Sequence, residues 1–247
     1  MSGQNCTSTL SKKDRTAQAL WRSGVYLFLS RCFLFPGEPL EELKEEATTS
    51  LQKLGESELA RALVDLPLPR LEELRREYVG VFGHGTSQDF PQYETENEKS
   101  HISSQSQTLA EIAGCYGHSG LAVAQGERLD HIGVELEFLY FLAHKEAYAL
   151  GSEGGKKVDQ CQGAQREFFR AHLGRWGPTF FHRLVGVGGF YGGLSSLAGR
   201  FLSREGEALG IDFEEFSSGD SVLGDPEMYA WEDSFCSEAS GADADCL

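Results

Sequence analysis

The segment Glu127–Glu146, ERLDHIGVELEFLYFLAHKE, carries the residue types and spacings most informative about chemistry. Asp130 stands where an apolar helical pattern begins, so its carboxylate is predicted to accept hydrogen bonds from free first-turn amides. On such a helix His131, Glu135 and Phe138 share one side, and the neighbouring side is also apolar. The helix is therefore either deeply buried or lines an apolar groove with a polar rim. The alternative from spacing alone is a capping Asp beside a surface His.

A second informative segment is Glu77–Glu94, EYVGVFGHGTSQDFPQYE. Gly83 and Gly85 allow the chain to turn sharply or to approach another backbone closely. The alternative is a helix end followed by an ordinary loop. A phosphate-binding loop is not predicted, because the glycines follow no strand and the Gly-Lys-Ser/Thr sequence is missing.

Metal chemistry has an incomplete set of candidate ligands. Cys115-x-x-His118, with His131 and His144 further along the chain, supplies four nitrogen or sulfur ligands at no recognised spacing. A nucleophile motif such as Gly-x-Ser-x-Gly is missing. We predict no enzyme activity, no metal and no cofactor; the alternative is a metal- or cofactor-binding helical enzyme that uses those four residues.

Charge and cysteine content restrict the partners and the compartment. The 247 residues include 22 Lys and Arg against 38 Asp and Glu, a formal net charge of −16, which argues against a nucleic-acid partner. No basic residue follows Arg204, whereas 13 acidic residues do. Six cysteines without a Cys-x-x-Cys pair favour a reducing, cytoplasmic compartment. No segment is predicted to insert stably into a membrane.

Helical periodicity runs through most of the chain, and no stretch alternates as a strand would. The expected helices are 15–35, 40–54, 58–63, 71–82, 109–116, 130–150, 158–176 and 179–209. We predict an all-α fold: a flexible N-terminus at 1–14, a single helical-bundle domain at 15–210 with a long central loop, and an acidic, largely disordered tail at 211–247. The glycines between 186 and 193 are predicted to permit close helix packing.

The order of these motifs resembles the TorD/DmsD/NarJ family of cytoplasmic chaperones for molybdenum enzymes. The segments that carry the resemblance are Tyr78–Gly85 (YVGVFGHG), Pro91–Thr95 (PQYET), Glu127–His131 (ERLDH), Glu135–Phe138 (ELEF), and the series Phe168, His172-Leu173, Trp176, Phe180 and Tyr191. Leu129, His84 and Thr95 depart from the family pattern of Pro, Pro and Ser. The long loop and acidic tail are similar to those of chaperones for type II dimethyl-sulfoxide-reductase-like enzymes.

The resemblance implies a TorD-like bundle that binds a client and does not catalyse a reaction. Its client is the catalytic subunit of a molybdopterin-dependent oxidoreductase, held at its twin-arginine signal peptide until the cofactor is inserted and export proceeds. In this view Asp130 and Glu135 pair with guanidinium groups, and His131 orients Asp130 or reports pH. A homodimer formed by domain exchange is compatible with such a bundle. The residues assigned to signal-peptide and client binding are Tyr78, Phe82, Gly83, Gly85, Pro91, Tyr93, Glu94, Glu127, Asp130, His131, Glu135 and Phe138.

Overall fold

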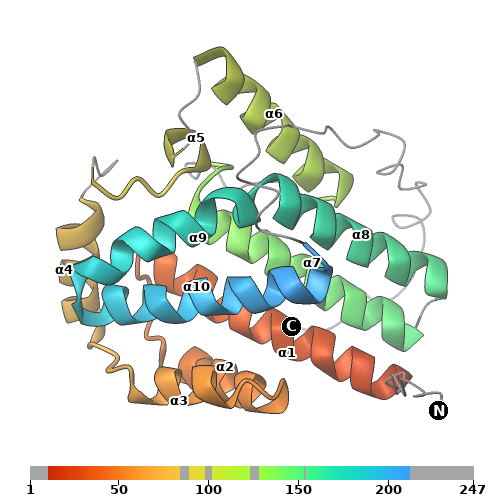
Figure 1. Ribbon diagram of the computed structural model, residues 1–247, viewed down its shortest axis with the longest axis horizontal. Helices are drawn as coiled ribbons and strands as arrows, with labels where there is room; N and C mark the ends of the chain where they lie inside the picture. Colours follow the sequence, from red (N-terminus) through yellow and green to blue (C-terminus); the bar gives the residue numbers. More distant parts are fainter. Residues whose placement is uncertain (1–10, 84–88, 98–101, 123–127, 153, 212–247) are drawn as a thin grey trace, which may run out of the picture.

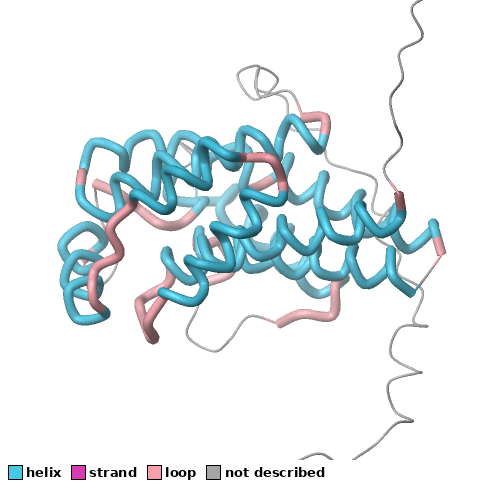
Figure 2. Tube along the Cα trace, turned by 90° about the horizontal axis from the view of Figure 1, so that it is seen from below, coloured by secondary structure: helices cyan, strands magenta, loops and turns pink. Residues whose placement is uncertain are grey.

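The computed structural model describes residues 11–83, 89–97, 102–122, 128–152 and 154–211. Within these ranges every named element is a helix, and Figure 2 accordingly shows only helix and loop, so the predicted all-α fold is confirmed. The elements are α1 (Lys12–Phe33), α2 (Glu41–Lys53), α3 (Ser57–Asp65), α4 (Leu71–Phe82), α5 (Glu94–Asn97), α6 (Ile102–His118), α7 (Ile132–Ser152), α8 (Gly155–Ala171), α9 (Leu173–Leu184), the 3₁₀ turn η1 (Val185–Val187) and α10 (Gly189–Leu209).

Several predicted boundaries were wrong. The break expected at Gly177-Pro178 lies instead at His172, whose φ of −123° and ψ of −98° separate α8 from α9. Pro178 is accommodated inside α9. The central loop is shorter than expected, because α5 and the first turns of α6 occupy part of it. These local choices depend on contacts with other elements, which sequence periodicity does not contain.

Helices α1 and α7 form the centre of the bundle and run antiparallel (Figure 1). The Lys12 ammonium at the start of α1 donates to the Gly151 carbonyl at the end of α7, over 3.3 Å. At the other end, a Cβ on Gly133 would lie 2.8 Å from the Leu34 side chain. The two helices can approach this closely only because residue 133 has no side chain.

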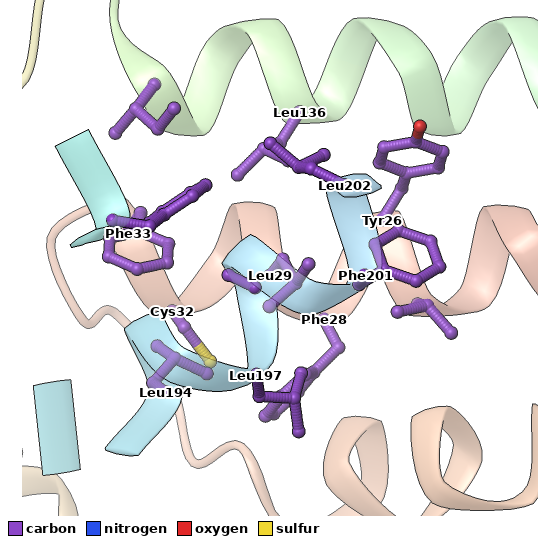
Figure 3. Packing of buried hydrophobic residues seen from close by; sticks show 14 of the residues in the cluster. Tyr26, Phe28, Leu29, Cys32, Phe33, Leu136, Leu194, Leu197, Phe201 and Leu202 are labelled. Atoms are coloured by element: carbon purple, nitrogen blue, oxygen red, sulfur yellow. The ribbon is translucent and has the colours of Figure 1, made fainter. Parts of the chain in front are cut away.

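The third central helix, α10, crosses α1 with its apolar side facing inward (Figure 3). The Tyr26 and Phe201 rings meet edge-on with centroids 5.1 Å apart. The Phe33 and Tyr191 rings are tilted toward each other with centroids 6.1 Å apart. Aromatic pairs of this geometry add to the free energy gained by burying their area. The core therefore joins the first and last described helices.

The glycine-rich start of α10 confirms the predicted close packing at two positions. A Cβ on Gly193 would lie 2.5 Å from the Leu66 side chain, and one on Gly192 would lie 3.0 Å from the Val185 carbonyl oxygen. A side chain at either position would push neighbouring elements apart. None of the described helices is long and apolar enough to cross a membrane.

Candidate functional site

The two informative sequence segments meet in an antiparallel backbone contact. Tyr93 pairs with His131 as an isolated bridge. The Glu94 amide donates to the Asp130 carbonyl over 2.9 Å, and the Ile132 amide donates to the Gln92 carbonyl over 2.8 Å. The start of α7 is thus fixed to the segment that leads into α5.

Asp130 is fully buried, and its carboxylate binds groups of this chain. Its Oδ2 accepts from the Thr95 hydroxyl over 2.6 Å and from the Thr95 amide over 3.2 Å. The predicted capping of α7 by Asp130 was wrong: His131 Nδ1 accepts from the Gly133 amide over 3.0 Å instead. Asp130 precedes α7 by two residues, and its side chain turns toward α5.

Arg128 supplies the cation that balances the buried Asp130. Its Nε donates to Asp130 Oδ1 over 3.0 Å and its Nη2 to Oδ2 over 2.9 Å, a bidentate pair. Its Nη1 donates to Glu96 Oε1 over 2.7 Å, and the guanidinium carbon lies 3.9 Å from the centre of the Tyr93 ring. Burial acts to lower the pKa of Arg128, but the Asp130 and Glu96 carboxylates raise it by more. The pKa is therefore above its usual value, and the group stays charged.

His131 is neutral at physiological pH. Burial lowers its pKa to about 4, although the neighbouring Asp130 carboxylate acts in the opposite direction. Because Nδ1 accepts a hydrogen bond, the ring proton resides on Nε2. The ring stands edge-on to Tyr93 with centroids 5.3 Å apart. A residue with this pKa does not report changes in pH between 6 and 8.

Beneath this surface lies a buried pair of carboxyl groups. Glu94 and Glu135 are both fully buried. Glu135 Oε2 accepts from the Trp176 indole over 3.1 Å, whereas its Oε1 accepts no hydrogen bond from a described donor. Burial and the facing Glu94 carboxylate raise the pKa of Glu135 well above its usual value. A protonated Glu135 that donates to Glu94 satisfies both groups.

His172 completes this cluster from the junction of α8 and α9. Its Nδ1 lies 3.1 Å from Glu94 Oε2. Burial lowers the pKa of His172, but a hydrogen bond with the Cys115 thiol and the Glu94 carboxylate raise it to about 9. With this pKa the His172 imidazole is protonated at pH 7 and forms an ion pair with the Glu94 carboxylate.

Comparison with family models matches residues 41–182, more than half of the chain, to the nitrate reductase delta subunit family. The chain belongs to this family. The family is of the NarJ/TorD type, so the resemblance stated from the motifs is confirmed, and the chain is a redox-enzyme maturation chaperone. The matched residues include all twelve assigned to client binding.

Among solved structures, a proposed redox enzyme maturation protein from Archaeoglobus fulgidus is similar with a TM-score of 0.46 and 24% identity, over 74% of this chain and 93% of that chain. No curated protein matches the chain.

The structure brings several of the assigned family residues together and leaves others in the core. Tyr93, Glu94, Asp130, His131 and Glu135 form one connected group, as described above. Gly83 ends α4 with a φ of 75°. Gly85 and Glu127 lie outside the described residues. Tyr78, Phe82, Pro91 and Phe138 are buried; the Tyr78 hydroxyl donates to Gln92 Oε1 over 3.1 Å, which ties it to the bridge segment.

Most apolar residues on the two adjacent sides of α7 are buried, which favours deep burial, the first of the two alternatives for this helix. Phe138 stacks against Tyr116 and Phe168 with centroids 4.6 Å away in each case. The exposed part of the site is instead its edge at Tyr93, Glu96 and Arg128, which are half-buried or exposed.

Sequence reasoning missed Arg128 and Glu96. Arg128 stands two residues before Asp130, a spacing that could have drawn attention to it. Glu96 and Tyr93 lie next to Arg128 only because the backbone bridge brings their segments together. No sequence pattern predicts that bridge.

The four residues of the alternative metal site are not brought together. In the described part of the chain, no group of three or more His, Cys, Asp or Glu could hold a metal ion. His131 and His144 are thirteen residues apart, which separates them by about 20 Å along α7. His118 is exposed, and its Nδ1 lies 2.6 Å from the Gly114 carbonyl oxygen.

Proposed function

We propose that this chaperone binds the catalytic subunit of a molybdopterin-dependent oxidoreductase in the cytoplasm, at the subunit's twin-arginine signal peptide, during cofactor insertion and before export. The proposal starts from family membership, since the family acts on such enzymes. It places the contact at the exposed edge of Tyr93, Glu96 and Arg128, which covers the buried Asp130.

The observation that carries the proposal is the charge at this edge. Two carboxylates, Asp130 and Glu96, share one guanidinium. The edge therefore keeps an excess negative charge, beside an aromatic ring, on a protein that is itself strongly acidic. These groups match the basic start of a twin-arginine leader, because carboxylates bind guanidinium bidentately and aromatic faces attract it.

The apolar part of the leader has a candidate contact in Phe35. Its side chain is 57% exposed although its ring stands edge-on to Tyr78 at 5.5 Å. Tyr78 in turn is bonded to Gln92, the neighbour of Tyr93. Covering an exposed ring by an apolar segment gains about 25 cal/mol per Å².

The test is fluorescence anisotropy with a labelled twin-arginine leader from a molybdopterin oxidoreductase of the same host. We expect micromolar binding to the wild-type chain and at least tenfold weaker binding of the same peptide with both arginines replaced by lysine, because lysine cannot bind in a bidentate manner. Glu96→Gln should weaken binding severalfold. The matched control is Glu137→Gln, because Glu137 is also a partly exposed partner of one arginine, Arg31.

Equal binding of the arginine and lysine peptides, or no binding of either, would contradict the signal-peptide proposal. Capture of the catalytic subunit by the chain from host extract tests the broader client assignment separately. A homodimer stays a prediction, and light scattering on the purified chain measures it.

A further inference from the structure

Arg128 is bound in a way that a free arginine side chain could reproduce. All three nitrogens of its guanidinium donate to this edge: Nε and Nη2 to Asp130, Nη1 to Glu96, and Nη2 also to the Thr95 hydroxyl over 3.0 Å. The Tyr93 ring covers one face of the group at 3.9 Å. Carboxylates in the plane and an aromatic ring above it are complementary to guanidinium and not to ammonium.

The main acceptor, Asp130, is held by the fold independently of Arg128. Asp130 is fixed by the Thr95 amide and hydroxyl and by its own backbone hydrogen bond with Glu94. Glu96 lies in α5, and its buried Oε2 has no hydrogen-bond partner among the described residues. The receiving Asp130 carboxylate is thus pre-positioned, and Oε2 of Glu96 is a further acceptor atom.

Arg128 itself is the replaceable member of the group. Its side chain is 41% exposed, whereas the Asp130 side chain that it contacts is 0% exposed. Because so much of the Arg128 side chain already faces solvent, a change of its rotamer can release the guanidinium without moving the backbone. Solvation of the released charge offsets part of the lost contacts.

We propose that Asp130, Glu96 and Tyr93 form an arginine-binding subsite that Arg128 occupies in the free protein, and that an arginine of the client displaces Arg128 from it. The displacement by a client rests on the proposed function; the existence of the subsite does not. Because Arg128 competes for the subsite, it lowers the affinity of the subsite for every arginine ligand. Only a ligand that makes further contacts with the protein displaces it.

The first experiment needs no client. N-acetyl-L-arginine amide is titrated into wild type, Arg128→Ala and the control Arg31→Ala, with binding followed by two-dimensional NMR and by the melting temperature. Arg31 is a suitable control because it also pairs with one glutamate and is 37% exposed. We expect Arg128→Ala to bind N-acetyl-L-arginine amide at least tenfold more tightly than wild type does, and its melting temperature to rise with ligand concentration until it saturates. N-acetyl-L-lysine amide should neither bind in this way nor raise the melting temperature. Equal affinities for all three proteins would overturn the subsite.

Two additions keep the result decisive. Arg128→Gln retains bulk and hydrogen bonding if Arg128→Ala fails to fold, and the same gain in affinity is expected. In wild type labelled with ¹⁵N, the Nε–H signal of Arg128 should shift toward that of a solvated arginine at saturating arginine amide. A signal that does not move while ligand binds elsewhere refutes the displacement.

The leader peptide then separates the two proposals. About tenfold tighter binding to Arg128→Ala than to wild type or Arg31→Ala supports displacement by the client. Equal binding to all three proteins refutes displacement while the proposed function stands. If no protein binds the peptide but Arg128→Ala still binds arginine amide, the signal-peptide function fails and the subsite stands.

Discussion

The pair formed by Glu94 and His172 makes a definite prediction about how stability depends on pH. The pKa of His172 is about 9 in the folded chain against 6.5 for an ordinary histidine. Because the folded pKa is the higher one, the stabilisation is complete below pH 6.5 and is lost as the pH rises through 9. A difference of this size corresponds to about 3 kcal/mol of unfolding free energy.

The perturbation that tests the part of this contribution due to Glu94 is Glu94→Gln. It removes the carboxylate while keeping the size of the side chain, so a buried imidazolium is left without its counter-charge. We expect the unfolding free energy to fall by about 3 kcal/mol at pH 6.5, as for other broken buried pairs. Near pH 9.5, where most of the imidazole is neutral in both proteins, the difference should shrink to below about 1 kcal/mol.

The assay is urea unfolding followed by circular dichroism at several pH values between 6 and 9.5. NMR titration of the His172 ring gives its pKa directly in both proteins. Glu137→Gln serves as the control, since Glu137 is 40% exposed, and should change stability by less than about 0.5 kcal/mol at every pH. The reasoning is refuted if wild type and Glu94→Gln lose stability in parallel between pH 6.5 and 9.

Three further predictions concern other parts of the molecule. The pKa of His131 is about 4 in the folded chain, below the ordinary 6.5, so its contribution to folding stability is complete above pH 6.5 and is lost as the pH falls toward 4. In acid unfolding experiments this loss of stability should disappear in His131→Asn. Arg22→Ala, which leaves two buried glutamates unpaired, should cost about 3 to 5 kcal/mol in urea unfolding, whereas exposed Arg200→Ala should cost less than about 1. Gly133→Ala should lower the melting temperature because its Cβ meets the leucine that follows α1, whereas Gly163→Ala, in open space within α8, should raise it.

The sequence determined the helical class and the identity of the site segments. Apolar spacing located most helices, and the acidic balance argued against nucleic acid. The motifs around Tyr93 and Asp130 were recognisable because their order along the chain resembles that of a family, which the comparison then showed. Residue types at short range carry this information, since periodicity and turn chemistry act over a few residues.

The role of each site residue was decided by the tertiary structure. Asp130 was expected to cap α7 and to face a ligand, yet its carboxylate is buried against Thr95 and Arg128. Nothing within the segment 127–146 specifies this, because Thr95 reaches Asp130 only through the backbone bridge between Tyr93 and His131.

The protonation states also depended on the fold. Glu135 and His172 have altered pKa values because the fold buries them together with Glu94 and brings the half-buried Cys115 beside His172. Local spacing was enough to predict the helical class and the segments that matter, but not every helix boundary. Which groups are buried together, and which arginine meets which carboxylate, became clear from the folded structure alone, because desolvation and pairing depend on residues far apart in the chain.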